Sequence, residues 1–277
     1  MTTSTDFYVR FWGVRGSIAC CAADYLRYGG NTSCLEIRCG DYIMVFDAGT
    51  GIRPLGKQLV AKLPVVADVF FTHTHLDHLI WLPFFAPLYK PNSEIRIWSG
   101  HLEPPMTFKD AIGHLMAPPL FPVPPTVFVS EPEFRDFRAG DVLTPSPGVT
   151  LRTAPLNHPN GATGYRVEWH GKSICYITDN EHIPGRPDPV LLDLIRDTDI
   201  FIYDCSYTDE EYPTYEGWGH STWQEGVRLA DAARVKQLVL FHHDPSHNDT
   251  AMDRIAADAA EARPGTVTAR EGMILQP

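Results

Sequence analysis

One short stretch constrains the fold of this chain more than any other. An apolar run, Val69–Phe71, is closely followed by His73, His75, Asp77 and His78. Three imidazoles and a carboxylate at this spacing suit zinc, manganese or iron. A strand that stops at such a cluster delivers its ligands at the carboxyl end, where α/β folds place their sites. A solvated histidine-rich loop is the alternative, but the preceding strand is too apolar to leave the cluster in solvent.

The composition is that of an ordinary globular protein. Hydrophobic residues make up 44% of the 277 residues and charged residues 21%, which leaves ample material for a core. The formal net charge is −11 and there is no long basic run, which argues against a nucleic-acid polymer as partner. A small anionic substrate remains compatible with this charge, because bound metal ions dominate the local field.

The sequence carries no mark of a membrane or secretory protein. Residues 1–6 are polar and lack the basic and apolar regions of a signal peptide, and no apolar stretch reaches the length that spans a bilayer. The six cysteines include no CxxC pair, so we interpret them as reduced thiols. We therefore expect a cytoplasmic chain with no membrane partner.

Strand-rich and helical segments follow one another twice along the chain. Alternating and apolar runs predict strands at 7–13, 32–38, 42–46, 68–72, 94–99, 151–158, 172–177, 199–203, 237–241 and 266–270. Periodicity and capping residues predict helices at 52–63, 76–82, 107–116, 189–196, 249–262 and, capped by Ser221, up to residue 233. No stretch has linker composition, so we expect one domain over residues 1–277, with two packed sheets and helices outside. The proline-dense loop 117–125 is expected to be an ordered lid or pocket wall, or else a linker.

Several predicted strands end in a residue that can bind a metal. Beyond the opening cluster, these residues are His158, Asp179, Asp204 and His242. A single one would mean little, because lone histidines are usually hydrogen-bonded core or surface residues. The repetition of a strand followed by a ligand is what indicates a metal site.

This order of ligands resembles the metallo-β-lactamase superfamily of binuclear metallohydrolases, over residues 7–270. The resemblance implies an α/β fold of the αββα four-layer sandwich type and two divalent metal ions, zinc or manganese, with iron as a further option. Two such ions can share a hydroxide and clamp both the attacking and the leaving oxygen. The ligands it implies are His73, His75 and His158 for one ion, Asp77, His78 and His242 for the other, and Asp179 between them. His242 is preferred to His243 because it directly follows its strand.

A second motif narrows the chemistry. Gly219-His220-Ser221-Thr222 resembles the His-Ser-Thr motif of the phosphodiesterase branch of that superfamily, which includes tRNA 3′-processing endonucleases and a cyclic phosphodiesterase. The resemblance implies that His220 acts near the leaving group, oriented by Asp204, with Asp77 as a further catalytic group. Asp204 replaces the usual glutamate and is one methylene shorter, which leaves the orienting contact open. A surface histidine near a helix start is the alternative for His220.

Two residues near the N-terminus are candidate substrate contacts. The segments 12–17 and 28–34 resemble the opening of a bacterial subgroup of the same superfamily. Arg15 and Asn31 could hold a phosphate there, and structural roles in turns are equally compatible with their positions. Ala19-Cys20-Cys21 departs from the proline-containing stretch of that subgroup, so the entrance loop is expected to differ.

These features favour a phosphodiesterase that acts on a small phosphodiester, such as a cyclic one, through a hydroxide shared by two metals. Hydrolysis of a carbon ester such as a lactone or thioester is the first alternative, but it leaves His220 without a task. A tRNA 3′-processing endonuclease is the second, and a non-enzymatic ligand sensor with a metal site is the third. The sequence leaves the oligomeric state open, and the apolar loop 117–125 is a candidate homodimer interface.

Overall fold

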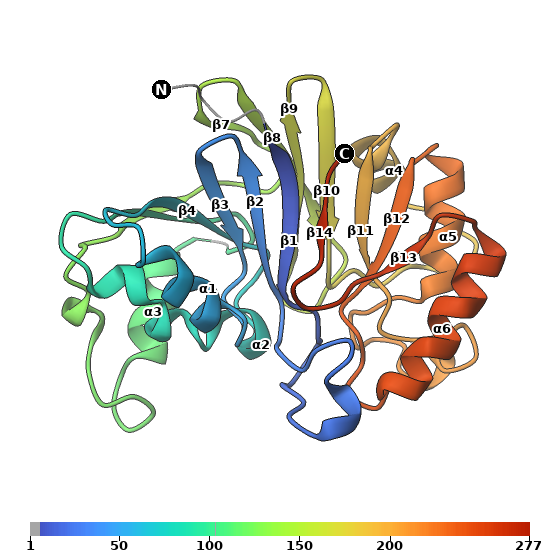
Figure 1. Cartoon of the computed structure of the whole chain (residues 1–277), viewed down its shortest axis with the longest axis horizontal. Coiled ribbons are helices and arrows are strands. Elements are labelled where there is room, and N and C mark those ends of the chain that lie inside the picture. The colour runs from blue at the N-terminus through green and yellow to red at the C-terminus, as the bar shows by residue number, and fades with distance from the viewer. Residues whose placement is uncertain (1–5, 103) are drawn as a thin grey trace.

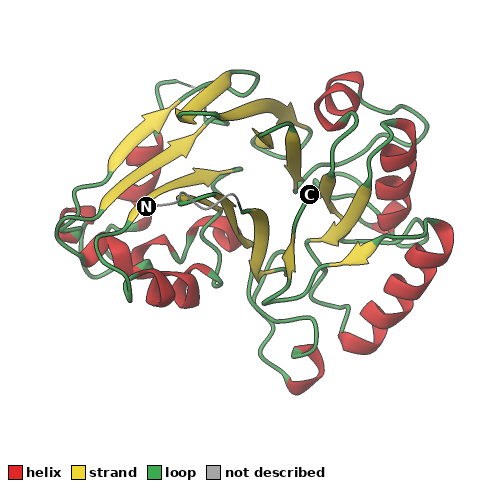
Figure 2. Cartoon of the chain, turned by 45° about the horizontal axis from the view of Figure 1, so that its top comes forward, coloured by secondary structure: helices red, strands yellow, loops and turns green. Residues whose placement is uncertain are grey.

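Two β-sheets packed face to face form the centre of the molecule, with helices on both outer faces (Figures 1 and 2). The computed structural model describes residues 6–102 and 104–277, so the expected polar N-terminus lies almost wholly outside the described residues. Each sheet has seven strands. The predicted αββα four-layer sandwich is thereby confirmed, whereas the assignment of residues 1–277 to one domain stays a prediction.

The first sheet comes mainly from the N-terminal half and runs in the order β14-β1-β2-β3-β4-β5-β6. Its strands are β1 (Phe7–Gly13), β2 (Cys34–Cys39), β3 (Tyr42–Phe46), β4 (Val66–Phe71), β5 (Glu94–Ser99), β6 (Glu133–Asp136) and β14 (Ile274–Leu275). The helices beside it are α1 (Ile52–Leu59), α2 (Leu76–Leu79) and α3 (Phe108–Leu115). Strands β3 to β6 are parallel to one another.

The second sheet runs in the order β13-β12-β11-β10-β9-β8-β7. Its strands are β7 (Val142–Ser146), β8 (Val149–Leu156), β9 (Ala162–Trp169), β10 (Lys172–Ile177), β11 (Ile200–Asp204), β12 (Gln237–Phe241) and β13 (Val267–Thr268). Helices α4 (Pro189–Ile195), α5 (Trp223–Ala232) and α6 (Asp249–Ala262) cover its outer face. Strands β10 to β13 are parallel.

Alternation along the strands produces three separate cores between the four layers. In β3, Met44 and Phe46 face the other sheet, while Val45 packs under the helices of the first layer. Tyr203 of β11 faces α5, whereas Ile202 belongs to the core between the sheets. Both sheets are therefore buried on two faces, which explains why their central strands read as continuous apolar runs.

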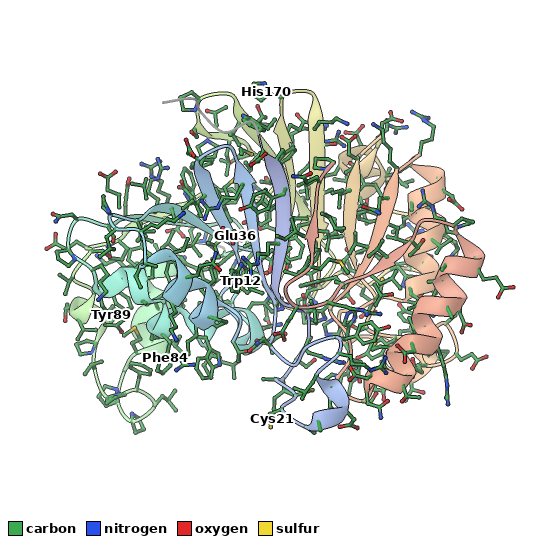
Figure 3. The ribbon with its side chains drawn as sticks, in the orientation of Figure 1. Trp12, Cys21, Glu36, Phe84, Tyr89 and His170 are labelled. Carbon is green, nitrogen blue, oxygen red and sulfur yellow. The ribbon has the colours of Figure 1, made fainter. Side chains whose placement is uncertain are left out.

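The carboxyl ends of the parallel strands all point to one end of the sandwich. Phe71 ends β4, Ile177 ends β10 and Phe241 ends β12, each just before predicted ligands. His170, in the turn before β10, lies at the opposite end of the sandwich from these ligands. Cys21, in the loop between β1 and β2, lies at the same end as the ligands (Figure 3). The topology thus gathers ligands from both halves of the chain at one edge.

The structure departs from the predicted elements at a few boundaries. The first helix ends at Leu59 instead of residue 63, and Thr222, not Ser221, caps α5 by accepting the N–H of Glu225. The two-residue strand β14 was not predicted, because it is too short to show periodicity. All six cysteines are free, as expected. Within the described residues, no helix combines the length and the apolar character needed to span a bilayer.

Candidate metal centre

Three histidine rings meet at the end of β4. His75 Nδ1 lies 3.0 Å from His158 Nε2, so the loop after β4 and the end of β8 share one corner of the site. His73 is 1% exposed, and its Nε2 has no hydrogen-bond partner among the described residues. A buried ring nitrogen without a partner is costly unless it binds something. These three nitrogens therefore form a set that could hold one metal ion.

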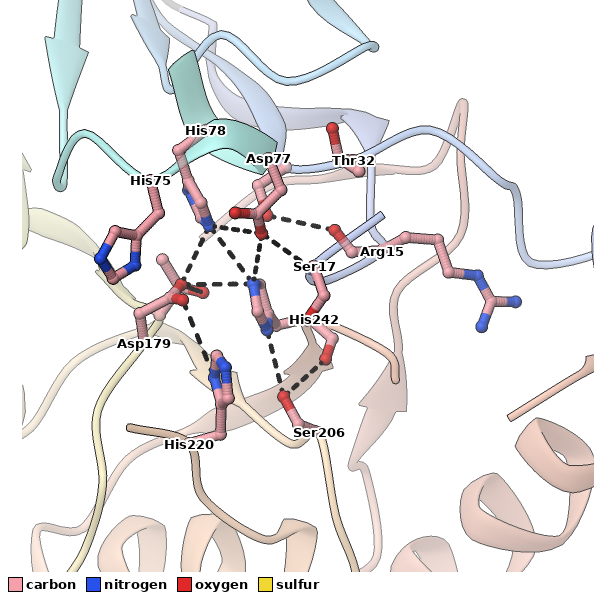
Figure 4. A network of polar contacts seen from close by, with 12 residues as sticks. Arg15, Ser17, Thr32, His75, Asp77, His78, Asp179, Ser206, His220 and His242 are labelled. Carbon is pink, nitrogen blue, oxygen red and sulfur yellow. Dashed lines mark hydrogen bonds and ion pairs between the residues drawn. The ribbon is translucent and has the colours of Figure 1, made fainter. Parts of the chain in front are cut away.

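A second set of four ligand atoms lies beside the first. His78 Nε2 is 3.1 Å from Asp77 Oδ2 and 3.2 Å from Asp179 Oδ2. His242 Nε2 is 3.3 Å from His78 Nε2, 3.4 Å from Asp77 Oδ2 and 3.3 Å from Asp179 Oδ2 (Figure 4). The edges of a tetrahedron with ligands about 2.0–2.1 Å from its centre are about 3.3 Å long. The residues present therefore fit a divalent ion at this position.

Asp179 links the two sets. Its Oδ2 belongs to the second set, while its Oδ1 lies 3.8 Å from His73 Nε2 and 3.7 Å from His158 Nε2. One carboxylate thus presents one oxygen to each set of ligands. This arrangement can bridge two ions, as in two-metal hydrolytic sites.

The histidines of the two ligand sets differ in their protonation state. Burial holds the pKa of His73 and of His158 below the usual range, so both rings are neutral and free to bind a metal. Burial also opposes a charge on His78, but the nearby Asp77, Asp179 and Asp47 carboxylates raise its pKa well above the ordinary value. An ion that enters the second set must therefore displace a proton from His78.

A set of buried hydrogen bonds fixes the ring orientations. The Asp47 carboxylate accepts from His78 Nδ1 at 2.9 Å, from the Tyr176 hydroxyl at 2.9 Å and from the backbone N–H of Thr72 at 2.8 Å. The Gly219 carbonyl accepts from His158 Nδ1 at 2.8 Å. Contacts of this kind set the tautomer and raise the basicity of the ligand nitrogen. The sequence analysis gave Asp47 no role in the site. Asp47 nevertheless directly follows strand β3, just as the candidate ligands follow their strands.

Three residues at strand ends share an uncommon backbone conformation. Asp47, Asp179 and His242 have φ values of +62°, +56° and +61°. The left-handed region is rare for residues other than glycine, although Asp and His are enriched there. It turns the chain sharply after β3, β10 and β12, and it directs all three side chains into the same site. Such strain persists only where the surrounding structure holds it, and it clusters at functional sites.

The His220–Asp204 pair lies beside the metal ligands. His220 Nδ1 is 3.0 Å from Asp204 Oδ2, so the shorter acid makes the orienting contact. The same carboxylate also accepts from the backbone N–H of Asp179 and from both the N–H and the hydroxyl of Ser206. Four accepted bonds use the capacity of a carboxylate and favour an orienting role, although Asp204 and His220 also belong to a third group, with Asp179 and His242, that could hold an ion. Burial opposes a charged imidazole, but Asp204 raises the pKa of His220 to about 9.

The site opens into a cavity of about 420 Å³. Among the predicted residues, the lining includes His75, Asp77, His158, Asp179 and His220. Sequence reasoning missed four lining residues, which are Ser17, Thr74, Leu76 and Trp218. Thr74 and Leu76 lie within the 73–78 cluster, and Trp218 directly precedes the 219–222 motif. Their closeness to these motifs in the sequence could have identified them as lining residues. Among the described residues, the lining contains no lysine or arginine.

Neither candidate substrate contact belongs to the cavity lining among the described residues. Arg15 is fully buried, and its guanidinium points away from the ligands toward the backbone carbonyls of Gly29 and His247 (Figure 4). The Asn31 side chain donates to Glu271 at 2.9 Å. Both residues therefore hold turns, the alternative that the sequence left open.

Two further expectations can be compared with the positions of the residues. His242 lies in the second set of ligands, whereas His243 points into the core, where its Nε2 bonds the Ala269 carbonyl at 2.9 Å. The loop 117–125 does not contribute to the cavity lining. Phe121 instead contacts Phe84, at 6.2 Å between ring centroids, beside the helical layer of the first sheet. The expected pocket wall is thus absent from the described cavity lining: Phe121 packs elsewhere, and Leu120 and Val123 are exposed to solvent.

Comparison with known proteins identifies the family. The sequence profile described as "Beta-lactamase superfamily domain" matches residues 43–243, which span the two ligand sets. The chain belongs to the β-lactamase superfamily. The metallo-β-lactamase fold protein YhfI of Bacillus subtilis has a similar structure, with a TM-score of 0.72 at 18% identity, over 99% of this chain and 100% of that one. The fold of this superfamily implies divalent metal ions, in agreement with the ligand sets.

Several relatives are named ribonuclease Z. The chain is 23% identical to ribonuclease Z of Gemmatimonas aurantiaca over 83% of its own length and 85% of that protein. It is 24% identical to ribonuclease Z of Myxococcus xanthus, with coverage of 86% and 89%. The expectation of a metal-dependent hydrolase is confirmed. The net charge led us to expect that a nucleic-acid polymer is not a partner. That expectation is wrong, because both of these relatives of the chain are named as ribonucleases.

Proposed function

We propose that the chain is a two-metal phosphodiesterase. The first ion would be held by His73, His75 and His158, the second by Asp77, His78 and His242, and Asp179 would bridge them. The near-tetrahedral second set and the unpartnered His73 nitrogen support this assignment. Imidazole and carboxylate ligands suit zinc or manganese, and iron is compatible with them.

The charge of the loaded site favours a phosphodiester. Two dications together with the carboxylates of Asp77 and Asp179 leave a formal charge of about +2 in the site. This local field would attract an anion in spite of the net charge of −11. When bound, two such ions supply Lewis-acid activation of a water and of the phosphoryl oxygens.

His220 would deliver the proton that the leaving oxygen needs. The ionised Asp204 carboxylate can only accept a hydrogen bond, so the Nδ1 of His220 carries a proton and faces Asp204. His220 also lines the cavity, which allows its Nε2 to donate to a substrate oxygen. Hydrolysis would then give a phosphomonoester and an alcohol, with the alcohol oxygen protonated by His220.

The His220–Asp204 hydrogen bond is the observation that carries this proposal. A carbon-ester hydrolase could use the same metal ligands, but it would give this buried and oriented acid no task. An alanine at position 220 that left activity on the true substrate intact would therefore favour the carbon-ester alternative.

A panel of phosphodiesters tests the proposal. The metal-free protein is loaded with zinc or manganese and assayed on bis(p-nitrophenyl) phosphate and on 2′,3′-cyclic and 3′,5′-cyclic nucleotides. We expect turnover of at least one of them, and its loss in Asp179→Asn. The proposal fails if fully loaded protein turns over none of these compounds and no RNA substrate.

A second candidate substrate is the 3′ end of a precursor tRNA. The ribonuclease Z relatives favour it, and the chemistry at phosphorus would be the same. The measurement is kcat/KM for a precursor tRNA with a 3′ trailer against kcat/KM for a cyclic nucleotide. A value several orders of magnitude higher for the tRNA, falling with added salt, would assign the enzyme to RNA processing.

A further inference from the structure

We propose that Trp218 is a stacking platform for an unpaired nucleobase next to the scissile phosphate. The inference rests on the proposed phosphodiesterase function and names its substrate class, a nucleotide or the single-stranded end of a nucleic acid. It concerns a residue that lines the cavity, outside both sets of metal ligands.

Trp218 is a large apolar side chain left open at the mouth of a polar site. It is 62% exposed, and it lines the same cavity as His75, Asp179 and His220. A single exposed apolar side chain is ordinary on a protein surface. An indole fixed at the entrance of the cavity is different, because a ligand bound there would cover it.

The backbone around Trp218 is held on both sides. Gly217 and Gly219, with φ of +89° and +88°, donate their N–H groups to the two oxygens of the Glu181 carboxylate at 2.9 and 2.6 Å. The Gly219 carbonyl in turn accepts from His158 Nδ1. The position of the indole is therefore tied directly to a predicted metal ligand, and stacking surfaces gain affinity when they are fixed in advance.

Aromatic rings pack against the indole of Trp218. Tyr215 stacks on Tyr207 with ring centroids 4.3 Å apart and planes 6° apart, and Trp218 meets Tyr215 edge to face at 5.4 Å. Tyr207 also approaches His220 at 6.0 Å. The three aromatic rings thus form one column that begins beside the proposed acid and ends at the cavity mouth.

The charge and the apolar content of the other lining residues limit which ligands could bind against these aromatic rings. Among the described residues, no lysine or arginine lines the cavity, so apart from His220, which is assigned to the leaving oxygen, a second phosphate group would find no cationic side chain there. Leu76 is the other apolar side chain in the lining, which is too little to enclose an acyl chain. A nucleobase fits both conditions, because its flat face stacks on an aromatic ring while its polar edges stay in water.

The test compares two substrates that share a leaving group, of which only one carries a nucleoside. These are thymidine 5′-(p-nitrophenyl phosphate) and methyl p-nitrophenyl phosphate, and kcat/KM is measured for both with the metal-loaded protein. Base–aromatic stacking contributes about 1–3 kcal/mol per base, so Trp218→Leu should lower the preference for the nucleoside substrate roughly 5- to 150-fold. Trp218→Phe should retain most of that preference, because it keeps an aromatic face.

Leu120→Ala is the matched control, because Leu120 is 79% exposed and lies outside the cavity lining. It should keep the preference of the natural protein. An unchanged preference in Trp218→Leu, or an equal loss on both substrates, would overturn the stacking role.

Failure of the proposed function has a different signature. If the loaded protein hydrolyses neither substrate, binding of adenosine 5′-monophosphate and of ribose 5-phosphate is measured by calorimetry. The stacking role predicts tighter binding of the nucleotide in the natural protein and no such preference in Trp218→Leu. Equal affinity of the natural protein for both ligands would reject the stacking platform by itself.

Discussion

The His220–Asp204 pair is the residue-scale feature that separates phosphodiester chemistry from other hydrolysis. We expect His220→Ala to lower kcat on a diester with an alkoxide leaving group by about 10²- to 10³-fold, because general acid catalysis contributes on that order. A p-nitrophenolate needs no proton to leave, so the loss on bis(p-nitrophenyl) phosphate should be much smaller. Steady-state kinetics on the two substrates provides the comparison.

The control for this variant is its metal content. His220 lies outside the two proposed ligand sets, so elemental analysis should find the same number of ions in His220→Ala as in the natural protein. Equal losses for both leaving groups would show that His220 does not act as the acid.

His243 makes the stability of the metal-free protein depend on pH. Burial lowers its pKa to about 3, below the value of about 6.5 in an unfolded chain. A lowered pKa for a base means that the unfolded state takes up the proton first. The contribution to stability is therefore complete above about pH 6.5 and declines as the pH falls, by about 1.4 kcal/mol per pH unit until the folded pKa is reached.

We expect His243→Gln to remove this contribution while keeping a donor for the Ala269 carbonyl. The free energy of unfolding, measured in urea at pH 4.5, 5.5 and 6.5 with chelator present, should fall less steeply in the variant. Identical slopes in the two proteins would show that His243 titrates normally.

At the scale of elements, the loop between β11 and α5 sets the position of a metal ligand. A Cβ at Gly219 would lie 2.2 Å from His158 Nδ1, whereas a Cβ at Gly217 would meet no atom within 4 Å. Both glycines have a φ near +88°, so an alanine is strained at either position. Only Gly219→Ala should therefore displace His158 and weaken the first ion.

Calorimetric titration with zinc measures this difference. We expect Gly219→Ala to bind one of the two ions at least tenfold more weakly, while Gly217→Ala keeps both affinities and loses only stability. A similar loss of zinc affinity in both variants would mean that backbone strain, and not contact with His158, controls the site.

The elements that sequence alone identified are those with strong periodicity or a clear stop. Helix α6 was predicted at its observed bounds, and β10 likewise, because caps and turn residues flank both. The strand-then-ligand rule placed His158, Asp179 and His242 at the correct edge. It missed the role of Asp47, although β3 ends in the same left-handed turn as β10 and β12.

Side-chain direction was the main feature that the sequence did not encode. Arg15 follows a strand and a glycine turn, as a phosphate-binding residue would, yet its guanidinium packs over Tyr25 and bonds backbone carbonyls. Which way a loop side chain points depends on contacts with segments far along the chain, here residues 244–247. A local sequence pattern does not predict contacts between segments that lie far apart in the sequence.

On the scale of the whole molecule, the proposed metal site would join the two halves of the sandwich. His73, His75, Asp77 and His78 follow a strand of the first sheet, and His158, Asp179 and His242 follow strands of the second. Ions bound there should stabilise the folded chain as a whole, by about 2.7 kcal/mol for each ion at a hundredfold excess over its Kd.

Thermal unfolding with and without zinc tests this linkage and its dependence on pH. We expect the rise in Tm to shrink as the pH is lowered, because the raised pKa of His78 makes a proton compete with the second ion. Asp179→Asn should reduce the rise at every pH. A zinc effect on Tm that is independent of pH would contradict the proposed protonation of His78.

Net charge was a poor guide to partners at this scale. The value of −11 describes the average surface, whereas binding of a phosphodiester depends on the field inside one cavity. The ribonuclease Z relatives correct that inference, and the proposed two-metal site would give an acidic protein the local positive field that a polyanion requires.

The rate of phosphodiester hydrolysis as a function of metal loading tests the central claim most directly. Metal-free protein is titrated with manganese or zinc, and the initial rate on bis(p-nitrophenyl) phosphate is measured at each ratio of metal to chain. The two-metal phosphodiesterase proposed above predicts little activity at one ion per chain and a plateau at two. A plateau at one ion, or no hydrolysis at any loading, would contradict it.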